Sequence, residues 1–258
     1  MVRPFVKMFR MKGSEFYILI EDFHLPISRY IRERIFTHIV ELDLAENLND
    51  SLAFMRKIFD DPGKLIILII LNIIPIVNFI VLGYVARIVK DSPGVREVPK
   101  LENYGYLWIQ GLKMIIVAFT YMIIPIIVVI LSAIPLWWWL PTITPFATFG
   151  RGRAILFVLG IVLTFLFLIL SVIGIINMIK NDQFKKAFAI REILTIIKEI
   201  GWGKYIMWLL IMFIMALVIG GIGNIPYVGW LISAIISPIY LIFLGRSAGL
   251  LYAERRSP

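Results

Sequence analysis

Four long stretches without a charged residue constrain most strongly how this chain can fold. They cover residues 114–134, 154–179, 205–223 and 227–245, and a helix of about 20 apolar residues is enough to cross the hydrocarbon core of a bilayer. Lipid offers no hydrogen bonds to the backbone, so such stretches must fold as helices. The sequence therefore predicts an all-α fold, a polytopic integral membrane helix bundle with four full spans.

A fifth apolar stretch, residues 65–86, is long enough to cross but is interrupted by Asn72, Pro75 and Asn78. It is either one kinked span or two half-length helices that enter and leave the membrane on one face. Cytoplasmic flanks of membrane helices collect Lys and Arg. If the stretch turns back, nearly all the basic flanks share one side, whereas a crossing divides them more evenly. We therefore expect a re-entrant hairpin in the cell membrane, with both termini in the cytoplasm.

The N-terminal part of the chain is more polar than the rest. We expect residues 1–60 to form a cytoplasmic helical appendage on a membrane domain of residues 61–258. Isoleucines recur every four residues over 27–39, and a second helix is expected over 44–59, behind Asp43 as its N-cap. The Asp-Pro pair at 61–62 is a start signal for the first membrane helix.

Residues 183–200 alternate apolar and charged side chains at helical spacing. This pattern predicts an amphipathic helix that lies on the cytoplasmic interface or packs on the bundle. Besides the lipid bilayer, we expect other membrane proteins or a second copy as partners, through residues 1–60 and 183–200. The net charge of +9 is explained by basic residues flanking apolar spans, so we expect no nucleic-acid partner.

Residues 245–249, Gly-Arg-Ser-Ala-Gly, match the Gly-x-Ser-x-Gly pattern of serine hydrolases. That motif needs a strand-turn-helix context and a histidine partner, whereas here it ends an apolar helix and the only histidines are His24 and His38. These two histidines lack a third clear metal ligand, and the chain has no cysteine. We expect no catalytic, cofactor or metal site, and we interpret four residues as helix-packing positions. They are Gly245, Ser247, Ala248 and Gly249.

Two stretches of sequence resemble each other. The segment NIIPIV at 72–77 is similar to NIPYV at 224–228, and LGYVA at 82–86 is similar to LGRSA at 244–248. A shallow hairpin in one half and a full-depth hairpin in the other would give this pattern. Chance similarity between isoleucine-rich segments would give it as well.

Besides membrane shaping by a shallow hairpin wedge and interfacial helices, two classes of function remain open. The four spans lack the ionisable groups that proton-driven pumps need, which favours a non-enzymatic membrane component such as a scaffold, accessory subunit or assembly factor. The alternative is a channel or carrier for a small solute or lipid that uses the broken segment, because transporters place their sites at broken helices. The candidate residues for that site are Asn72, Pro75, Asn78 and Arg87, although the same residue types would also simply end two half-helices.

Several motifs in order resemble one known family. They are Phe59-Asp-Asp-Pro62-Gly-Lys64, IPIVNFIVLGY from Ile74 to Tyr84, VPKLENYG from Val98 to Gly105, and NIPYVGW from Asn224 to Trp230. From about Ser51 to Tyr252 the chain resembles a largely archaeal membrane family filed as domain of unknown function 4013. The resemblance implies a multi-pass membrane protein and supplies no activity, cofactor or catalytic residue. Residues 1–50 fall outside it.

Overall fold

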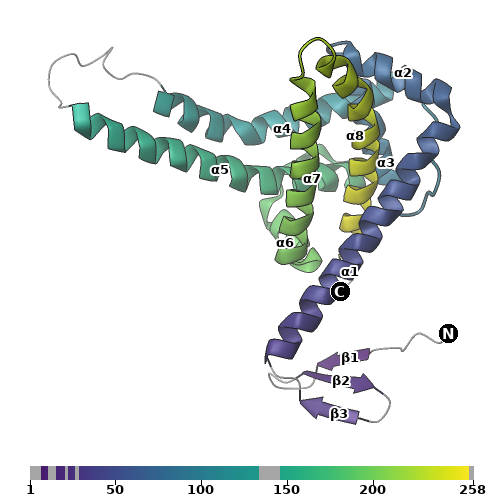
Figure 1. The fold of residues 1–258 in the computed structure, drawn as a ribbon, viewed down its shortest axis with the longest axis vertical. Coiled ribbons are helices and arrows are strands. Elements are labelled where there is room, and N and C mark those ends of the chain that lie inside the picture. The colour runs from purple at the N-terminus through teal and green to yellow at the C-terminus, as the bar shows by residue number, and fades with distance from the viewer. Residues whose placement is uncertain (1–6, 11–15, 21–22, 27–28, 134–145, 256–258) are drawn as a thin grey trace. The chain divides into compact units, whose positions relative to one another are not determined.

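The computed structural model describes most of the chain. It covers residues 7–10, 16–20, 23–26, 29–133 and 146–255, with side chains described from residue 43 on, apart from 133–151 and 153. The chain divides into two compact units, Met1–Glu46 and Asn47–Pro258, which can be followed by colour in Figure 1. Their boundary lies inside a helix, and not at residue 60, where the change in polarity placed it.

The first unit begins with a three-stranded antiparallel sheet in the order β1-β2-β3. The strands are Lys7–Arg10, Phe16–Ile20 and Phe23–Pro26. This sheet differs from the helical appendage expected over residues 1–60. The central strand has the sequence FYILI, and its aromatic and β-branched residues favour a strand over a helix.

Helix α1, Arg29–Arg56, is a single helix of 28 residues, where the sequence predicted two helices separated at Asp43. Neither glycine nor proline occurs within it, so no residue forces the backbone to leave the helix near Asp43. The preference of an aspartate for an N-cap position is too weak to interrupt a helix that is otherwise continuous. As a result, α1 begins in the first unit and ends in the second.

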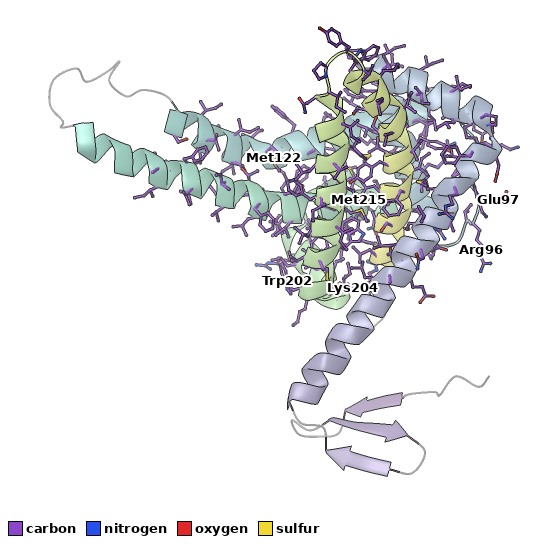
Figure 2. All side chains as sticks on the ribbon, viewed as in Figure 1. Arg96, Glu97, Met122, Trp202, Lys204 and Met215 are labelled. Atoms are coloured by element: carbon purple, nitrogen blue, oxygen red, sulfur yellow. The ribbon has the colours of Figure 1, made fainter. Side chains whose placement is uncertain are left out.

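The second unit contains the rest of the helices. After a short 3-10 helix, Lys57–Asp60, they are α2 (Pro62–Ile73), α3 (Phe79–Asp91), α4 (Tyr104–Ala133), α5 (Phe146–Asn181), a 3-10 helix (Phe184–Phe188), α6 (Ile190–Ile200), α7 (Trp202–Gly223) and α8 (Gly229–Ala253). Among the described residues, four helices are long and apolar enough to cross a membrane, within α4, α5, α7 and α8. Large apolar side chains lie exposed on all four (Figure 2). The prediction of a membrane helix bundle with four full spans is therefore confirmed.

The broken segment forms two short helices, α2 and α3, joined by a turn over residues 74–78. The Asp-Pro start signal is confirmed, because Pro62 opens α2 and the side chain of Asp61 accepts a 3.0 Å hydrogen bond from the Lys64 N–H. This bond to the ionised carboxylate, more than any other interaction, lowers the pKa of Asp61. Just before α2, Lys57 Nζ donates to the carbonyl of Arg96, which follows α3.

The turn between α2 and α3 has the same backbone form as the turn between α7 and α8. Ile76 and Tyr227, each directly after a proline, have φ of 70° and 66°. In both turns an N–H bonds back across four residues, from Asn78 to Ile74 at 3.0 Å and from Gly229 to Ile225 at 2.9 Å. The two similar sequence stretches thus fold into matching turns. The first turn joins two short helices, α2 and α3, and the second joins two long helices, α7 and α8.

Helix α3 lies between α4 and α8, in close contact with both. A Cβ added to Gly83 would lie 1.8 Å from the carbonyl oxygen of Leu107, and one added to Gly111 would lie 1.9 Å from that of Phe79. On its α8 side, Gly245 faces Val85. Glycine is required at Gly83 and Gly111 because the helix backbones approach too closely for any side chain, whereas at Gly245 the nearest atom is a side-chain carbon of Val85.

Residues 183–200 fold as the second 3-10 helix followed by α6. One face of α6 is buried, and its members recur at helical spacing: Ile193, Ile196, Ile197 and Ile200. Between the two alternatives that the sequence left open, the structure shows this face packed against the bundle, since α6 contacts α5, α7 and α8. The charged residues Arg191, Lys198 and Glu199 are left on its other side.

Candidate functional site

Arg246, near the end of α8, is the most highly connected polar residue of the described structure. Its side chain is 4% exposed and pairs with Asp50 of α1 at 2.8 Å. Its other end donates to the carbonyl of Val95 at 2.7 Å, and its guanidinium lies 4.9 Å from the centre of the Phe54 ring. One side chain thereby joins α1, α8 and the loop after α3.

Ser247, the next residue, points about 100° further round α8. Its hydroxyl donates to Asn47 Oδ1 at 2.6 Å and accepts from Trp208 Nε1 at 2.8 Å. Asn47 completes the connection by donating to the Ser247 carbonyl at 3.2 Å. Both hydrogen-bonding capacities of the hydroxyl are used, so Ser247 holds α1, α7 and α8 together.

Replacing Ser247 by alanine leaves the Trp208 N–H and the Asn47 oxygen without their partner in a buried site. We expect a loss of about 1 to 3 kcal/mol in the free energy of unfolding, the usual cost of an unsatisfied buried polar group. Denaturation in detergent, followed by tryptophan fluorescence, measures it. Thr120→Ala is the control, because that exposed hydroxyl bonds only to a carbonyl of its own helix and its loss should change little.

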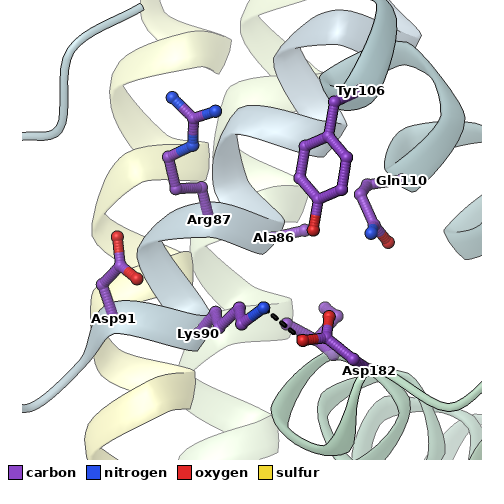
Figure 3. A pocket seen from close by; sticks show the side chains of 8 residues that line it. Ala86, Arg87, Lys90, Asp91, Tyr106, Gln110 and Asp182 are labelled. Atoms are coloured by element: carbon purple, nitrogen blue, oxygen red, sulfur yellow. Dashed lines mark hydrogen bonds and ion pairs between the residues drawn. The ribbon is translucent and has the colours of Figure 1, made fainter. Parts of the chain in front are cut away.

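A pocket of about 190 Å³ lies between α3, α4 and the end of α5, and we call it the Arg87 pocket (Figure 3). Helix α3 supplies charged residues one helical turn apart, and the first turns of α4 supply Tyr106 and Gln110. Ile179, near the end of α5, and Asp182, directly after that helix, close it. Its full lining is Ala86, Arg87, Lys90, Asp91, Tyr106, Gln110, Ile179 and Asp182.

Asp182 is placed in the pocket by the way α5 ends. Its φ of 53° is left-handed, and its N–H bonds to the carbonyl of Ile179 while that of Gln183 bonds to Met178. These are the two bonds of a Schellman C-cap, in which Asp182 stands where glycine is usual. The carboxylate then meets Lys90, which donates to it, and this hydrogen bond raises the pKa of Lys90.

Arg87 fixes the loop that leads into α4. Its two terminal nitrogens donate to the carbonyls of Lys100, at 2.9 Å, and Glu102, at 3.2 Å. Both partners are neutral, so the positive charge of Arg87 is not cancelled by a carboxylate among the described residues. The charge of Lys90, in contrast, is neutralised by its ion pair with Asp182.

The four candidate site residues of the broken segment are not brought together. Asn72 packs against α8, with its amide donating to Ser237 Oγ at 2.8 Å. Pro75 lies in the turn, and the buried Oδ1 of Asn78 has no partner among the described residues. Arg87 lies nine residues beyond Asn78, which is about 14 Å along a helix. Of the four, only Arg87 lines the pocket.

The family profile described as "Protein of unknown function (DUF4013)" matches residues 67–228. This match covers more than half of the chain. The chain belongs to this family. No curated protein and no solved structure matches the chain.

In this member of the DUF4013 family, the matched residues contain the whole Arg87 pocket but neither α1 nor α8. The matched region is also shorter than the resemblance from Ser51 to Tyr252 suggested. The pocket therefore lies within the part of the chain that matches the family, whereas Arg246 itself and its α1 partners Asp50 and Phe54 lie outside it.

The functional residues that sequence reasoning missed are Arg246, Lys90 and Asp182. The apolar stretch was taken to end at 245, whereas α8 continues to Ala253 with Arg246 inside it. The signal in the sequence that could have identified Arg246 was a single arginine between small residues near the end of an apolar helix. No local signal pairs Lys90 with Asp182, because they are distant in sequence. Among the described residues, no cluster of His, Asp and Glu could hold a metal, and the histidine side chains lie outside them.

Beyond the pocket, Lys186 donates to both oxygens of Glu192, at 2.9 and 2.7 Å, and so ties the second 3-10 helix to α6. This hydrogen bonding lowers the pKa of Glu192 below its ordinary value of 4.5. A carboxylate with a lowered folded-state pKa stabilises the fold above that ordinary value and loses this contribution as pH falls below it.

We therefore expect the stability of the protein to decrease by less than about 1 kcal/mol through loss of this pair on acidification below 4.5, because both side chains are one-third exposed. Thermal unfolding at several pH values, for the natural chain and for Glu192→Gln, measures the contribution as the difference between the two. If the difference is the same at every pH, the pair does not stabilise the fold.

Proposed function

We propose that this protein is a non-enzymatic membrane component that tethers its N-terminal unit, and a protein bound to it, to the membrane. Within that class it serves as a scaffold, accessory subunit or assembly factor. The observation that carries the proposal is the fixing of the last turns of α1: Asn47 bonds Ser247, Asp50 bonds Arg246, and Phe54 is buried in the core. Because α1 starts in the first unit, one continuous helix links that unit to the membrane.

The proposal includes a re-entrant α2–α3 hairpin. Lys57 and Arg96 flank the broken segment, and they are in hydrogen-bond contact. A segment whose two flanks touch starts and ends at the same place. A helix of 12 residues such as α2 is about 18 Å long, which is short of the roughly 30 Å hydrocarbon core.

Contacts with α8 give the depth that the hairpin reaches. The loop that follows α3 bonds to Arg246 through Val95, and Asn72, at the turn end of α2, bonds to Ser237. Arg246 and Ser237 are nine residues apart on α8, which is about 14 Å along the helix. From Ser237 to the start of α8 at Gly229 the helix continues for about 12 Å. The hairpin therefore extends along about half of α8, as a hairpin that ends near the middle of the bilayer would.

Labelling of single cysteines tests this topology in a chain that has no natural cysteine. Asp60→Cys and Glu97→Cys flank the broken segment, and Tyr227→Cys lies in the α7–α8 turn; all three residues are exposed, and Figure 2 shows Glu97 pointing away from the helices. In sealed cells an impermeant thiol reagent should label Tyr227→Cys alone. Labelling of Asp60→Cys without Glu97→Cys would mean that residues 65–86 cross the membrane.

The alternative function, a channel or carrier at the broken segment, requires Asn72 and Asn78 to face a solute. The Asn72 amide is instead occupied by Ser237, which supports a packing role. The test of the alternative is solute flux into proteoliposomes: a flux that Asn72→Leu abolishes without lowering stability would favour the carrier over the tether.

Purification from the native membrane in mild detergent tests the tether. The full chain should co-purify with a protein partner in fixed stoichiometry, and a chain lacking residues 1–46 should lose it. The thermal stability of the shortened chain is the control, because an unfolded remainder would lose partners for a trivial reason. Recovery of the full chain as a lone monomer would contradict the proposal.

A further inference from the structure

The Arg87 pocket lies where two membrane spans end. One candidate span runs from Tyr104 to Ser132, and Tyr106 is in its first turn; another ends at Asn181, directly before Asp182. The ends of spanning helices lie at the level of the lipid headgroups, where tyrosine is enriched. Once the chain is in a bilayer, the pocket therefore opens at headgroup depth.

Several hydrogen-bond donors line this pocket. A guanidinium has five N–H groups, and Arg87 uses only its contacts with two loop carbonyls, so donors and an uncancelled charge remain. Figure 3 shows the Tyr106 hydroxyl pointing into the pocket towards Lys90, with the Gln110 amide beside it. Arginine binds phosphate through parallel N–H donors, so this arrangement fits a phosphate group.

The carboxylates of the pocket decide which kind of phosphate it suits. Asp182 forms an ion pair with Lys90. The side chain of Asp91 interacts with Lys90 and Lys180 only through its charge, makes no hydrogen bond or close ion pair among the described residues, and would repel a bare phosphate dianion. A headgroup that also carries hydroxyl or amine donors would satisfy Asp91. The volume of about 190 Å³ is below the 300 to 1,000 Å³ typical of cofactor sites, which matches a headgroup.

The surroundings of the pocket suit the rest of a lipid. Ile109, next to Gln110 on α4, is 49% exposed, and Tyr106 is 46% exposed. Apolar area beside a polar pocket allows acyl chains to lie along α4 while the headgroup is bound. We propose that the Arg87 pocket binds the phosphate-bearing headgroup of a membrane phospholipid, with the phosphate at Arg87 and its hydroxyl or amine donors at Asp91. This inference is independent of the proposed tether.

Calorimetric titration of the full-length protein in detergent tests the site with three probes. They are short-chain phosphatidylglycerol, inorganic phosphate, and a short-chain diacylglycerol without phosphate. Phosphatidylglycerol should saturate one site, and Arg87→Gln should weaken it at least about 10-fold, since a hydrogen bond to a charged group is worth that much. Arg96→Gln removes an equal charge from the exposed loop after α3 and should leave the affinity unchanged.

Each result has one meaning. Weakening by Arg87→Gln and by Tyr106→Phe, with Arg96→Gln unaffected, supports the headgroup site, and Tyr106→Phe keeps the test valid if Arg87→Gln disturbs the loop. Inorganic phosphate binding as tightly as the lipid would overturn the lipid assignment. Equal binding of the diacylglycerol, or equal weakening by Arg96→Gln, would overturn the site itself.

Discussion

Replacing Arg246 by alanine is expected to lower the free energy of unfolding by about 3 kcal/mol, the lower part of the range for breaking a buried ion pair. The Arg246 side chain is 4% exposed, whereas Asp50 is 48% exposed, so water can solvate the remaining carboxylate and reduce the cost. The carbonyl of Val95 and the ring of Phe54 also lose their partner. Denaturation in detergent measures the change.

The same variant should loosen α1 where it joins the membrane unit. Hydrogen exchange of the backbone N–H groups in residues 47–56 is expected to become faster, because these turns are held by Arg246 and Ser247. Arg255→Ala is the matched control, since this exposed arginine contacts Tyr252 on its own helix end. If both variants were equally stable and equally protected, the contacts of Arg246 would not anchor α1.

Replacing Gly83 by alanine is expected to cost about 3 kcal/mol or more, at the upper end of the effects of overpacking. The new Cβ would lie 1.8 Å from the carbonyl oxygen and 2.4 Å from the carbonyl carbon of Leu107. Both atoms belong to the backbone of α4, so no side-chain rotation relieves the clash. Helices α3 and α4 would have to separate, and the Arg87 pocket between them would change shape.

Gly105→Ala, on the neighbouring helix α4, is the control for this substitution. A Cβ at Gly105 meets nothing within 4 Å, and alanine within a helix is more stable than glycine by about 0.5 to 1 kcal/mol. The two variants should therefore change thermal stability in opposite directions. If Gly83→Ala were as stable as Gly105→Ala, the close approach of α3 and α4 would be wrong.

Local patterns predicted the membrane helices well, because the length of an apolar stretch and the residues at its ends act over short distances. The Asp-Pro pair before α2 is confirmed by a hydrogen bond between residues three apart. The prediction of a wholly helical appendage was wrong in the first unit, because a strand sequence of five residues precedes a longer stretch with helical periodicity and was overlooked. It also divided α1 at Asp43, since an aspartate inside a helix looks the same in sequence as one that begins a helix.

The candidate site was only partly predictable for a different reason. Arg87 was identified from its place after a broken apolar stretch, but Lys90 and Asp182 are 92 residues apart in sequence, and Arg246 and Asp50 are 196 apart. Pairing across such distances is decided by the way helices pack, which composition and spacing do not encode.

By itself, the sequence determined that the chain is a multi-pass membrane protein with four apolar spans and a broken fifth segment, because a bilayer selects helices by their length and polarity alone. Only the tertiary structure decided which polar residues meet. The close contacts at Gly83, Gly111 and Gly245 place α3 between α4 and α8. That packing brings Arg246 to the last turns of α1, and it leaves the Arg87 pocket at the ends of two spans.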